Sequence, residues 1–217
     1  MIKDNLNEVR SSLSEGVHLV AVSKYHPIEA VAEAYAEGQR VFGESREQEL
    51  RVKHDSLPKD IQWYFIGHLQ TNKVKYIAPY VAMIETIDSI KLLREVNRQA
   101  ERCGRIIDVL LELHLAQEET KSGMLPSECI EMLEGGEWRT MCNVRICGIM
   151  MMASNTDNMD QVRQEFCRAD EFFNDIKQRY FSHSDHFSVK SYGMSNDYLI
   201  AQQCGSNHVR VGSKIFC

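Results

Sequence analysis

The sequence predicts an α/β fold, a single (β/α)8 TIM barrel in which parallel strands alternate with helices. Eight apolar, β-branched runs alternate with stretches of helical periodicity at a spacing of roughly 25 residues, and such alternation is typical of parallel sheets. The first strand is not followed by the G-x-G-x-x-G pattern, which weakens the alternative of a doubly wound open sheet. We therefore expect residues 1–217 to form one barrel domain, slightly short against a typical length of roughly 250 residues.

The first strand is predicted over residues 17–24, a continuous apolar run that suits burial on both faces of a sheet. Pro27 suits the first turn of the following helix, and Gly38 is its expected stop. A weaker helical pattern over residues 3–14 precedes the strand. Because the chain ends soon after the last strand, we expect this N-terminal helix to close the outer ring.

The second strand, over residues 40–44, leads into Ser45, a candidate N-cap for a helix over residues 46–56. The same patterns predict the elements of the central part. Strands are expected over residues 61–67, 81–88 and 106–115, a short helix after residue 73, helices over 89–103 and 126–133, and a polar loop over 116–123.

The last three strands are predicted over residues 144–153, 187–194 and 208–212, with helices over 157–181 and 195–203. The polar stretch 181–186 contains two histidines and an aspartate. We expect it to be a solvated loop and not a metal site.

The composition excludes several classes of function. The net charge is −6 and no basic block indicates a nucleic-acid surface, while no apolar run approaches the length of a membrane span. The N-terminus is polar and lacks the core of a signal peptide. The seven cysteines are scattered and none forms a C-x-x-C, which favours a reducing cytoplasm over a disulfide framework or a zinc site.

Lys24 is the first candidate for chemistry, because it stands where the first strand meets the loop before a helix. In parallel α/β folds this end of the sheet is where ligands bind. A lysine there can form a Schiff base with a carbonyl compound, or it can simply lead the chain out to solvent. The other strand ends that meet at this mouth are Glu44, Gly67 and His68, Asp88, His114, Met152, Met194 and Ser195, and Gly212 and Ser213.

Two of these strand ends are typical of anion sites. At residues 193–197, a glycine precedes Ser195, which we expect to cap the next helix and to expose free N–H groups. Gly212 and Ser213 form a small turn directly after the eighth strand, and barrels often hold phosphate in the loops after strands seven and eight.

Arg210 lies within the eighth strand, where the alternation with Val209 and Val211 allows it to point into the barrel. A buried arginine needs a partner, which a ligand ring nitrogen or a carboxylate would supply. A lysine, a phosphate site and a donor between them suit pyridoxal 5'-phosphate, and they equally suit a Schiff-base aldolase that acts on a sugar phosphate.

The chain resembles the pyridoxal phosphate homeostasis proteins, single-domain relatives of the barrel of alanine racemase, along nearly its whole length. The matching blocks are Ala-Val-Ser-Lys at 21–24, Phe-Gly-Glu at 42–44, Phe-Ile-Gly-His-Leu-Gln-Thr-Asn-Lys at 65–73, Ile-Asp-Ser at 87–89, Gly-Met-Ser-Asn-Asp at 193–197 and Val-Arg-Val-Gly-Ser-Lys-Ile-Phe at 209–216.

The resemblance implies that Lys24 forms a Schiff base with pyridoxal 5'-phosphate, that Ser195, Gly212 and Ser213 hold the phosphate, and that Arg210 faces the pyridine nitrogen. Met194, Ser45 and His68 complete the set of expected cofactor contacts. The family usually has Asn where Ser45 stands, so this contact departs from the pattern. Other departures are Ser-Tyr-Gly-Met-Ser at 191–195, Gly-Ser-Asn-His at 205–208 and Phe-Cys at 216–217.

The resemblance also implies a role in vitamin B6 and amino-acid balance without established turnover. An arginine at the ring nitrogen can only donate, which favours an unprotonated ring and a weaker electron sink. Alanine racemases use, in addition, a tyrosine from a C-terminal β domain, which this chain lacks. We expect a monomeric cofactor carrier that passes the cofactor to apo-enzymes; a racemase of low activity is the alternative.

Overall fold

The computed structural model describes residues 1–115 and 122–217. Most of the polar loop predicted over 116–123 therefore lies outside the described residues. Within the described parts of the chain, no helix combines the length and the hydrophobicity that a membrane span requires.

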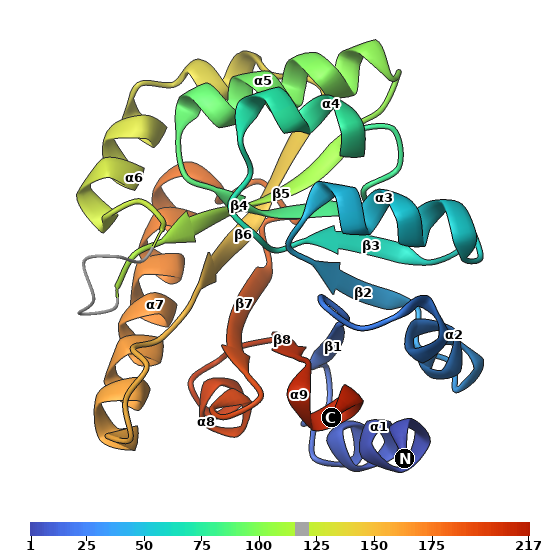
Figure 1. The fold of residues 1–217 in the computed structure, drawn as a ribbon. Helices are drawn as coiled ribbons and strands as arrows, with labels where there is room; N and C mark the ends of the chain where they lie inside the picture. The colour runs from blue at the N-terminus through green and yellow to red at the C-terminus, as the bar shows by residue number, and fades with distance from the viewer. Residues whose placement is uncertain (116–121) are drawn as a thin grey trace.

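Eight parallel strands form a closed barrel in chain order, and the last strand pairs with the first (Figure 1). The predicted fold class is confirmed, and each strand lies within its predicted range. The strands are β1 His18–Val22, β2 Val41–Glu44, β3 Gln62–Phe65, β4 Met83–Ile87, β5 Ile107–Leu113, β6 Val144–Met151, β7 Val189–Met194 and β8 His208–Val211.

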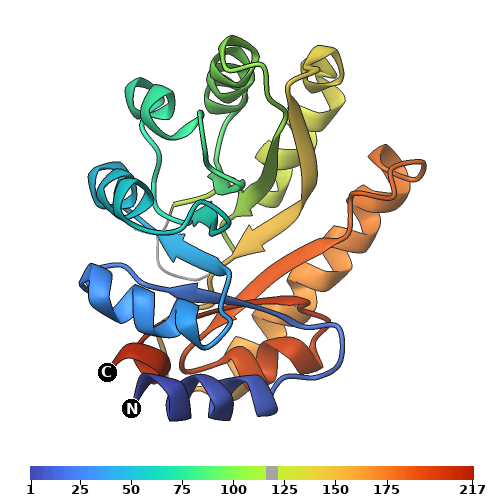
Figure 2. The ribbon, with the colours of Figure 1, turned by 90° about the vertical axis from the view of Figure 1, so that its right-hand side faces the viewer.

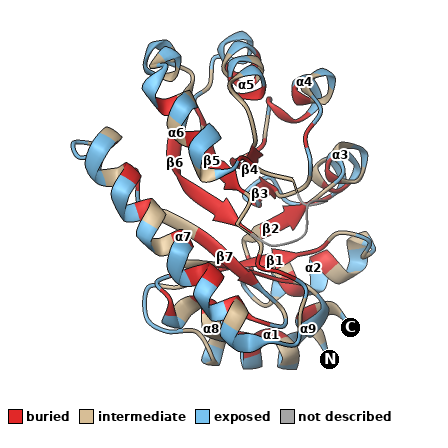
Figure 3. Ribbon diagram, turned by 90° about the vertical axis from the view of Figure 1, so that its left-hand side faces the viewer, coloured by how far each residue is buried: buried red, intermediate tan, exposed pale blue. Residues whose placement is uncertain are grey.

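Helices cover the outside of the barrel (Figure 2). Their apolar faces pack on the strands, so that burial concentrates on the sheet and exposure on the outer helix faces (Figure 3). The helices are α1 Ile2–Ser11, α2 Ile28–Ala36, α3 Glu47–Ser56, α4 Val74–Ile77, α5 Ile90–Arg102, α6 Pro126–Glu134, α7 Met159–Tyr180, α8 Tyr198–Gln203 and α9 Ser213–Phe216, with short 3-10 helices at Thr71–Lys73 and Glu137–Thr140.

The N-terminal helix takes the predicted place in the outer ring, but it shares that place with an element that was not predicted. α1 lies beside α9, and the two ends of the described chain lie together (Figure 1). The Asn5 side chain donates a hydrogen bond to the Ile215 carbonyl at 3.1 Å and fixes this contact.

Two predicted helix starts are wrong. Ser45 does not cap α3, because Arg46 occupies the N-cap position and no side chain caps the helix. The helix predicted from residue 195 begins only at Tyr198, with Asp197 at the N-cap. The loop after β7 is therefore longer than expected, and Ser195 is free for another contact.

The interior of the barrel is layered. An apolar layer formed by inward-facing side chains fills its middle. Two residues further along the strands, toward their carboxyl ends, the inward positions of β4, β5 and β8 carry Glu85, Glu112 and Arg210, all buried. These charges lie between the apolar layer and the mouth.

Candidate functional site

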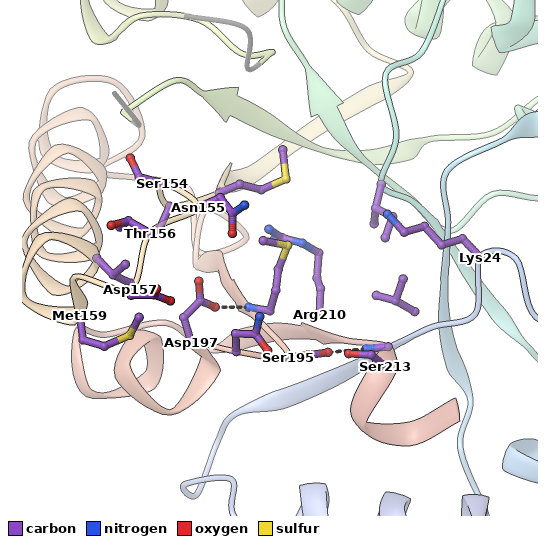
Figure 4. A pocket seen from close by; sticks show the side chains of 18 residues that line it. Lys24, Ser154, Asn155, Thr156, Asp157, Met159, Ser195, Asp197, Arg210 and Ser213 are labelled. Atoms are coloured by element: carbon purple, nitrogen blue, oxygen red, sulfur yellow. Dashed lines mark hydrogen bonds between the residues drawn. The ribbon is translucent and has the colours of Figure 1, made fainter. Parts of the chain in front are cut away.

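A cavity of about 590 Å³ opens at the carboxyl end of the barrel. Lys24 enters it from one side, residues 154–157 form the opposite wall, and Arg210 lies between them (Figure 4). Six of the predicted residues line it, namely Lys24, Met194, Ser195, Arg210, Gly212 and Ser213. Ser45 and His68 instead line a separate hollow of about 280 Å³ that extends over the start of α3.

The backbone on both sides of Lys24 is held by α3 and β2. Tyr25 adopts a left-handed conformation, with φ of 67°, and its N–H donates to Glu49 Oε1 at 2.7 Å. Lys53 Nζ donates to the Ser23 carbonyl and to Glu44 Oε1, both at 2.7 Å. The lysine loop is thus anchored at the residue before Lys24 and at the residue after it.

Lys53 and Glu44 form an almost fully buried ion pair beneath this loop. Burial raises the pKa of Glu44, although hydrogen bonds from Lys53 and from the Ser23 hydroxyl oppose the shift. This network was not predicted from the sequence. A lysine on the inner side of an amphipathic helix, at the position of Lys53, was the available signal.

The loops after β7 and β8 are joined by Ser195. Its hydroxyl accepts a hydrogen bond from the Gly212 N–H at 3.2 Å, so it does not cap α8. Asp197 Oδ1 accepts from the Met194 N–H at 2.6 Å and shapes the same turn. Within the described residues, no hydrogen bond occupies the N–H groups of Ser195 or Ser213. The two loops therefore offer amide donors to an anion.

Gly193 lets α8 pack closely behind this turn. Its φ is +88°, and a Cβ there would lie 2.6 Å from the Ala201 Cβ and 2.9 Å from the Tyr198 Cα. The glycine that the sequence marked as part of an anion site thus acts through packing, because it sets the position of the loop that follows.

Arg210 points into the barrel, as predicted, and is 4% exposed. Its Nη1 donates to the Ser191 carbonyl at 2.7 Å and to the Ser191 hydroxyl at 2.6 Å, and its Nη2 donates to the Met151 carbonyl at 2.9 Å. No hydrogen bond from the described part of the chain occupies Nε. The guanidinium is fixed at one edge and can donate from the other.

Glu85 is the carboxylate partner of this arginine, and sequence analysis missed it. Its Oε2 lies 3.4 Å from Arg210 Nη1 and accepts from the Ser191 hydroxyl at 2.8 Å. Complete burial raises the pKa of Glu85, while the charge of Arg210 opposes the shift. A glutamate in the middle of an otherwise apolar strand was the available signal.

The wall formed by residues 154–157 was also missed. Glu165 on α7 accepts from the Ser154 N–H at 2.6 Å and from the Ser154 hydroxyl at 2.7 Å, and its carboxylate is buried. This wall is therefore attached to the first turns of α7.

The arrangement supports three chemical actions in one space. A lysine amine can condense with a carbonyl carbon, amide groups can bind an anion, and an arginine can donate to an acceptor between them. In addition, Glu85 balances the charge of Arg210 from inside the barrel. A ligand therefore need not carry a negative charge to compensate the arginine.

Comparisons with known proteins agree on one family. The model of the alanine racemase N-terminal domain matches residues 1–217. A pyridoxal phosphate homeostasis protein of Schizosaccharomyces pombe is 37% identical over 95% of this chain and 86% of its own. The structure of PipY from Synechococcus elongatus without pyridoxal phosphate has a TM-score of 0.94 and 32% identity over the full length of both chains.

The structure of PipY with pyridoxal phosphate bound has a TM-score of 0.90 and 31% identity, again over both full chains. An alanine racemase of Clostridium difficile shares the fold, with a TM-score of 0.78 and 16% identity over 99% of this chain and 56% of the enzyme.

Proposed function

Because the chain belongs to the family of pyridoxal phosphate homeostasis proteins, we propose that it binds pyridoxal 5'-phosphate and acts in vitamin B6 and amino-acid homeostasis. It holds the cofactor and passes it on without strong catalysis. The observation that carries the proposal is that Lys24, the loops after β7 and β8, and Arg210 line one cavity.

The residues of the cavity fit this cofactor. Lys24 supplies the amine for a Schiff base, and Ser195 and Ser213 line the cavity with N–H groups that no described acceptor occupies and that would bind a phosphate. A Cβ at Gly212 would lie 2.9 Å from the Val22 carbonyl oxygen, so the glycine lets the loop after β8 pack closely on the end of β1. Arg210 Nε is the donor for the ring nitrogen. When bound, the cofactor supplies an electrophilic aldehyde and an electron-withdrawing ring.

Arg210 supports holding over turnover. A guanidinium is always protonated and can only donate, so it keeps the ring nitrogen unprotonated and the ring a weaker electron sink. Among the described residues, the lining of the cavity contains neither tyrosine nor histidine, the usual side chains for a second proton transfer.

The decisive experiment is an absorption spectrum of the purified protein before and after borohydride reduction, with mass mapping of the adduct. A visible band that is lost on reduction, with the adduct on Lys24, supports the proposal. Lys24→Ala should lose the band, whereas Lys91→Ala, on the exposed face of α5, should keep it. A protein without a band, even after addition of the cofactor, contradicts the proposal.

A racemase of low activity is the second candidate, and the likeness of fold to alanine racemase favours it. Racemisation of alanine or serine above a Lys24→Ala control would establish it. The absence of turnover in a protein that carries the band would support the carrier.

We further propose that residues 1–217 act as one cofactor-binding domain, as a monomer in the cytoplasm, with apo-enzymes as transient acceptors. The odd number and scattered positions of the cysteines support a reducing compartment. Light scattering at micromolar concentration tests the monomer, and transfer of the cofactor to an apo-enzyme, followed by the recovery of that enzyme's activity, tests the acceptor role.

A further inference from the structure

The thiols of Cys167 and Cys204 lie in direct contact, although the residues are 37 positions apart. Cys167, on α7, and Cys204, at the end of α8, place their Sγ atoms 3.3 Å apart. Cys167 is exposed and Cys204 is 8% exposed, so one thiol is open to a reagent and the other lies behind it. This pair has no part in the cofactor site described above.

The contacts on both sides of the pair already hold the two helices in register. Arg163 Nη2 donates to Gln203 Oε1 at 2.9 Å on one side. On the other side, Asp170 packs so closely on Gly205 that a Cβ at Gly205 would lie 2.4 Å from Asp170 Oδ1. Formation of a disulfide would bring the sulfur atoms from contact to a bond of about 2.05 Å, with the side chains rotating to the required dihedral angle.

The two helices carry opposite parts of the cavity. α7 holds the wall at residues 154–157 through Glu165, and α8 begins directly after the turn at Met194–Asp197 and packs behind Gly193. α7 and α8 are in contact, and Figure 2 shows the short α8 beside the lower part of the long α7. A covalent bond between the helices would join these two parts of the cavity.

We propose that Cys167 and Cys204 form a reversible disulfide site that couples the two helices and slows exchange of the bound cofactor. The disulfide itself stands on the geometry of the two thiols, whereas the effect on exchange rests on the proposed function.

The oxidant is a low-molecular-weight disulfide such as oxidised glutathione. The Cys167 thiolate attacks one sulfur of that disulfide and releases one glutathione thiolate. Cys204 then loses its proton to water, its thiolate attacks the Cys167 sulfur of the mixed disulfide, and the second glutathione thiolate leaves. Two protein thiols are oxidised by two electrons and one oxidised glutathione is reduced to two thiols.

The order of the two attacks follows from exposure. Burial and the neighbouring Cys167 raise the pKa of Cys204 to about 11, so this thiol is mostly protonated at neutral pH and reacts second. Raising the pH should therefore speed the conversion of the mixed disulfide into the protein disulfide.

The test treats the full chain, loaded with pyridoxal 5'-phosphate, with oxidised glutathione and maps its peptides without reduction. We expect a cross-linked peptide that joins Cys167 to Cys204, lighter by two hydrogen atoms and restored by dithiothreitol. Cys103→Ser should still form it, and Cys167→Ser should not. Stable glutathionylation of Cys167 without the cross-link would overturn the disulfide site.

Release of the cofactor is then followed by its visible band after dilution into an excess of a carbonyl scavenger. We expect release to be several-fold slower from the oxidised protein, and unchanged by the same treatment in Cys167→Ser. A cross-linked protein that releases the cofactor at the reduced rate would overturn the coupling. A protein that binds no cofactor would overturn the proposed function and the coupling with it, while the peptide map decides the disulfide independently.

Discussion

Arg210 is held by the Ser191 and Met151 carbonyls and has Glu85 as its buried carboxylate partner. Glu85 balances the arginine charge and shares the Ser191 hydroxyl with it, and no described acceptor occupies Nε. Removing one partner of a buried pair leaves the other charge uncompensated, which costs more than the pair contributes. The carboxylate acts on a ligand only through the arginine.

Glu85→Gln tests this dependence. The amide oxygen can still accept from Ser191, but the negative charge is lost, so we expect a free energy of unfolding lower by about 1–3 kcal/mol. We also expect weaker cofactor binding and a visible band whose position changes. Denaturant unfolding measures the change in stability, and titration with the cofactor measures the affinity and the position of the band. Glu131→Gln, on the exposed face of α6, should change neither, and an unaltered spectrum in Glu85→Gln would argue against a positioning role.

At the scale of elements, α3 determines where Lys24 stands. The ion pair between Lys53 and Glu44 joins the helix to β2, and the same lysine holds the Ser23 carbonyl. Both partners are almost fully buried, so neither can be compensated by water when the other is removed.

Lys53→Met should lower the free energy of unfolding by about 3–5 kcal/mol, because Glu44 then remains buried without its cation. The same change should reduce the yield of the borohydride adduct on Lys24. Adding Glu44→Gln removes the orphaned charge and should recover much of the stability. If the double variant unfolds as easily as Lys53→Met, the pair is not the source of the loss.

Gly193 gives a second test at this scale. Gly193→Ala adds a Cβ that meets Ala201 and Tyr198, and should displace α8 and weaken cofactor binding by at least tenfold, about 1.4 kcal/mol. Gly38→Ala is the matched control, because its φ of +86° is similar but nothing lies within 4 Å of the added Cβ. Equal losses of affinity in both variants would assign the effect to backbone strain.

At the scale of the whole molecule, stability should depend on pH through His208. Burial, together with the charges of His18 and Arg210, lowers the pKa of His208 to about 4. Between its ordinary pKa of about 6.5 and this value, the unfolded chain binds a proton that the folded chain does not. The stability linked to the neutral form of His208 is therefore fully present above about pH 6.5, and this contribution is lost as the pH falls from about 6.5 to about 4.

His208→Gln should remove this part of the pH dependence, which amounts to at most about 3 kcal/mol between pH 7 and pH 4. The buried glutamates are common to both proteins, so the difference between the two unfolding curves isolates the histidine. Thermal unfolding across this range measures it. Parallel curves for the two proteins would show that the pKa of His208 is the same in the folded and the unfolded chain.

How much of this molecule the sequence predicts depends on the range of each interaction. The strands and their order follow from local alternation, and Lys24, Ser195 and Arg210 follow from their places at or near strand ends. The start of α8 does not, because Ser195 and Asp197 are both good N-caps and tertiary packing decides between them. α9 is too short to show a period.

Glu85, Lys53 and Glu165 were missed for a different reason. Each is defined by a partner on another element, and sequence periodicity gives only the face on which a residue lies. The charge partners of a buried site therefore emerge once strand order and register are known.

The pairing of β1 with β8 has a consequence for synthesis of the chain. Lys24 lies in the loop just after β1, and the edge of that strand, from His18 to Ala21, pairs with residues 208–211. The first strand is synthesised long before the last. During elongation the edge of β1 therefore has no partner, and the cavity lacks the part that the loop after β8 forms. A ligand site that needs both Lys24 and the loop after β8 is therefore complete only once β8 has been made and paired with β1.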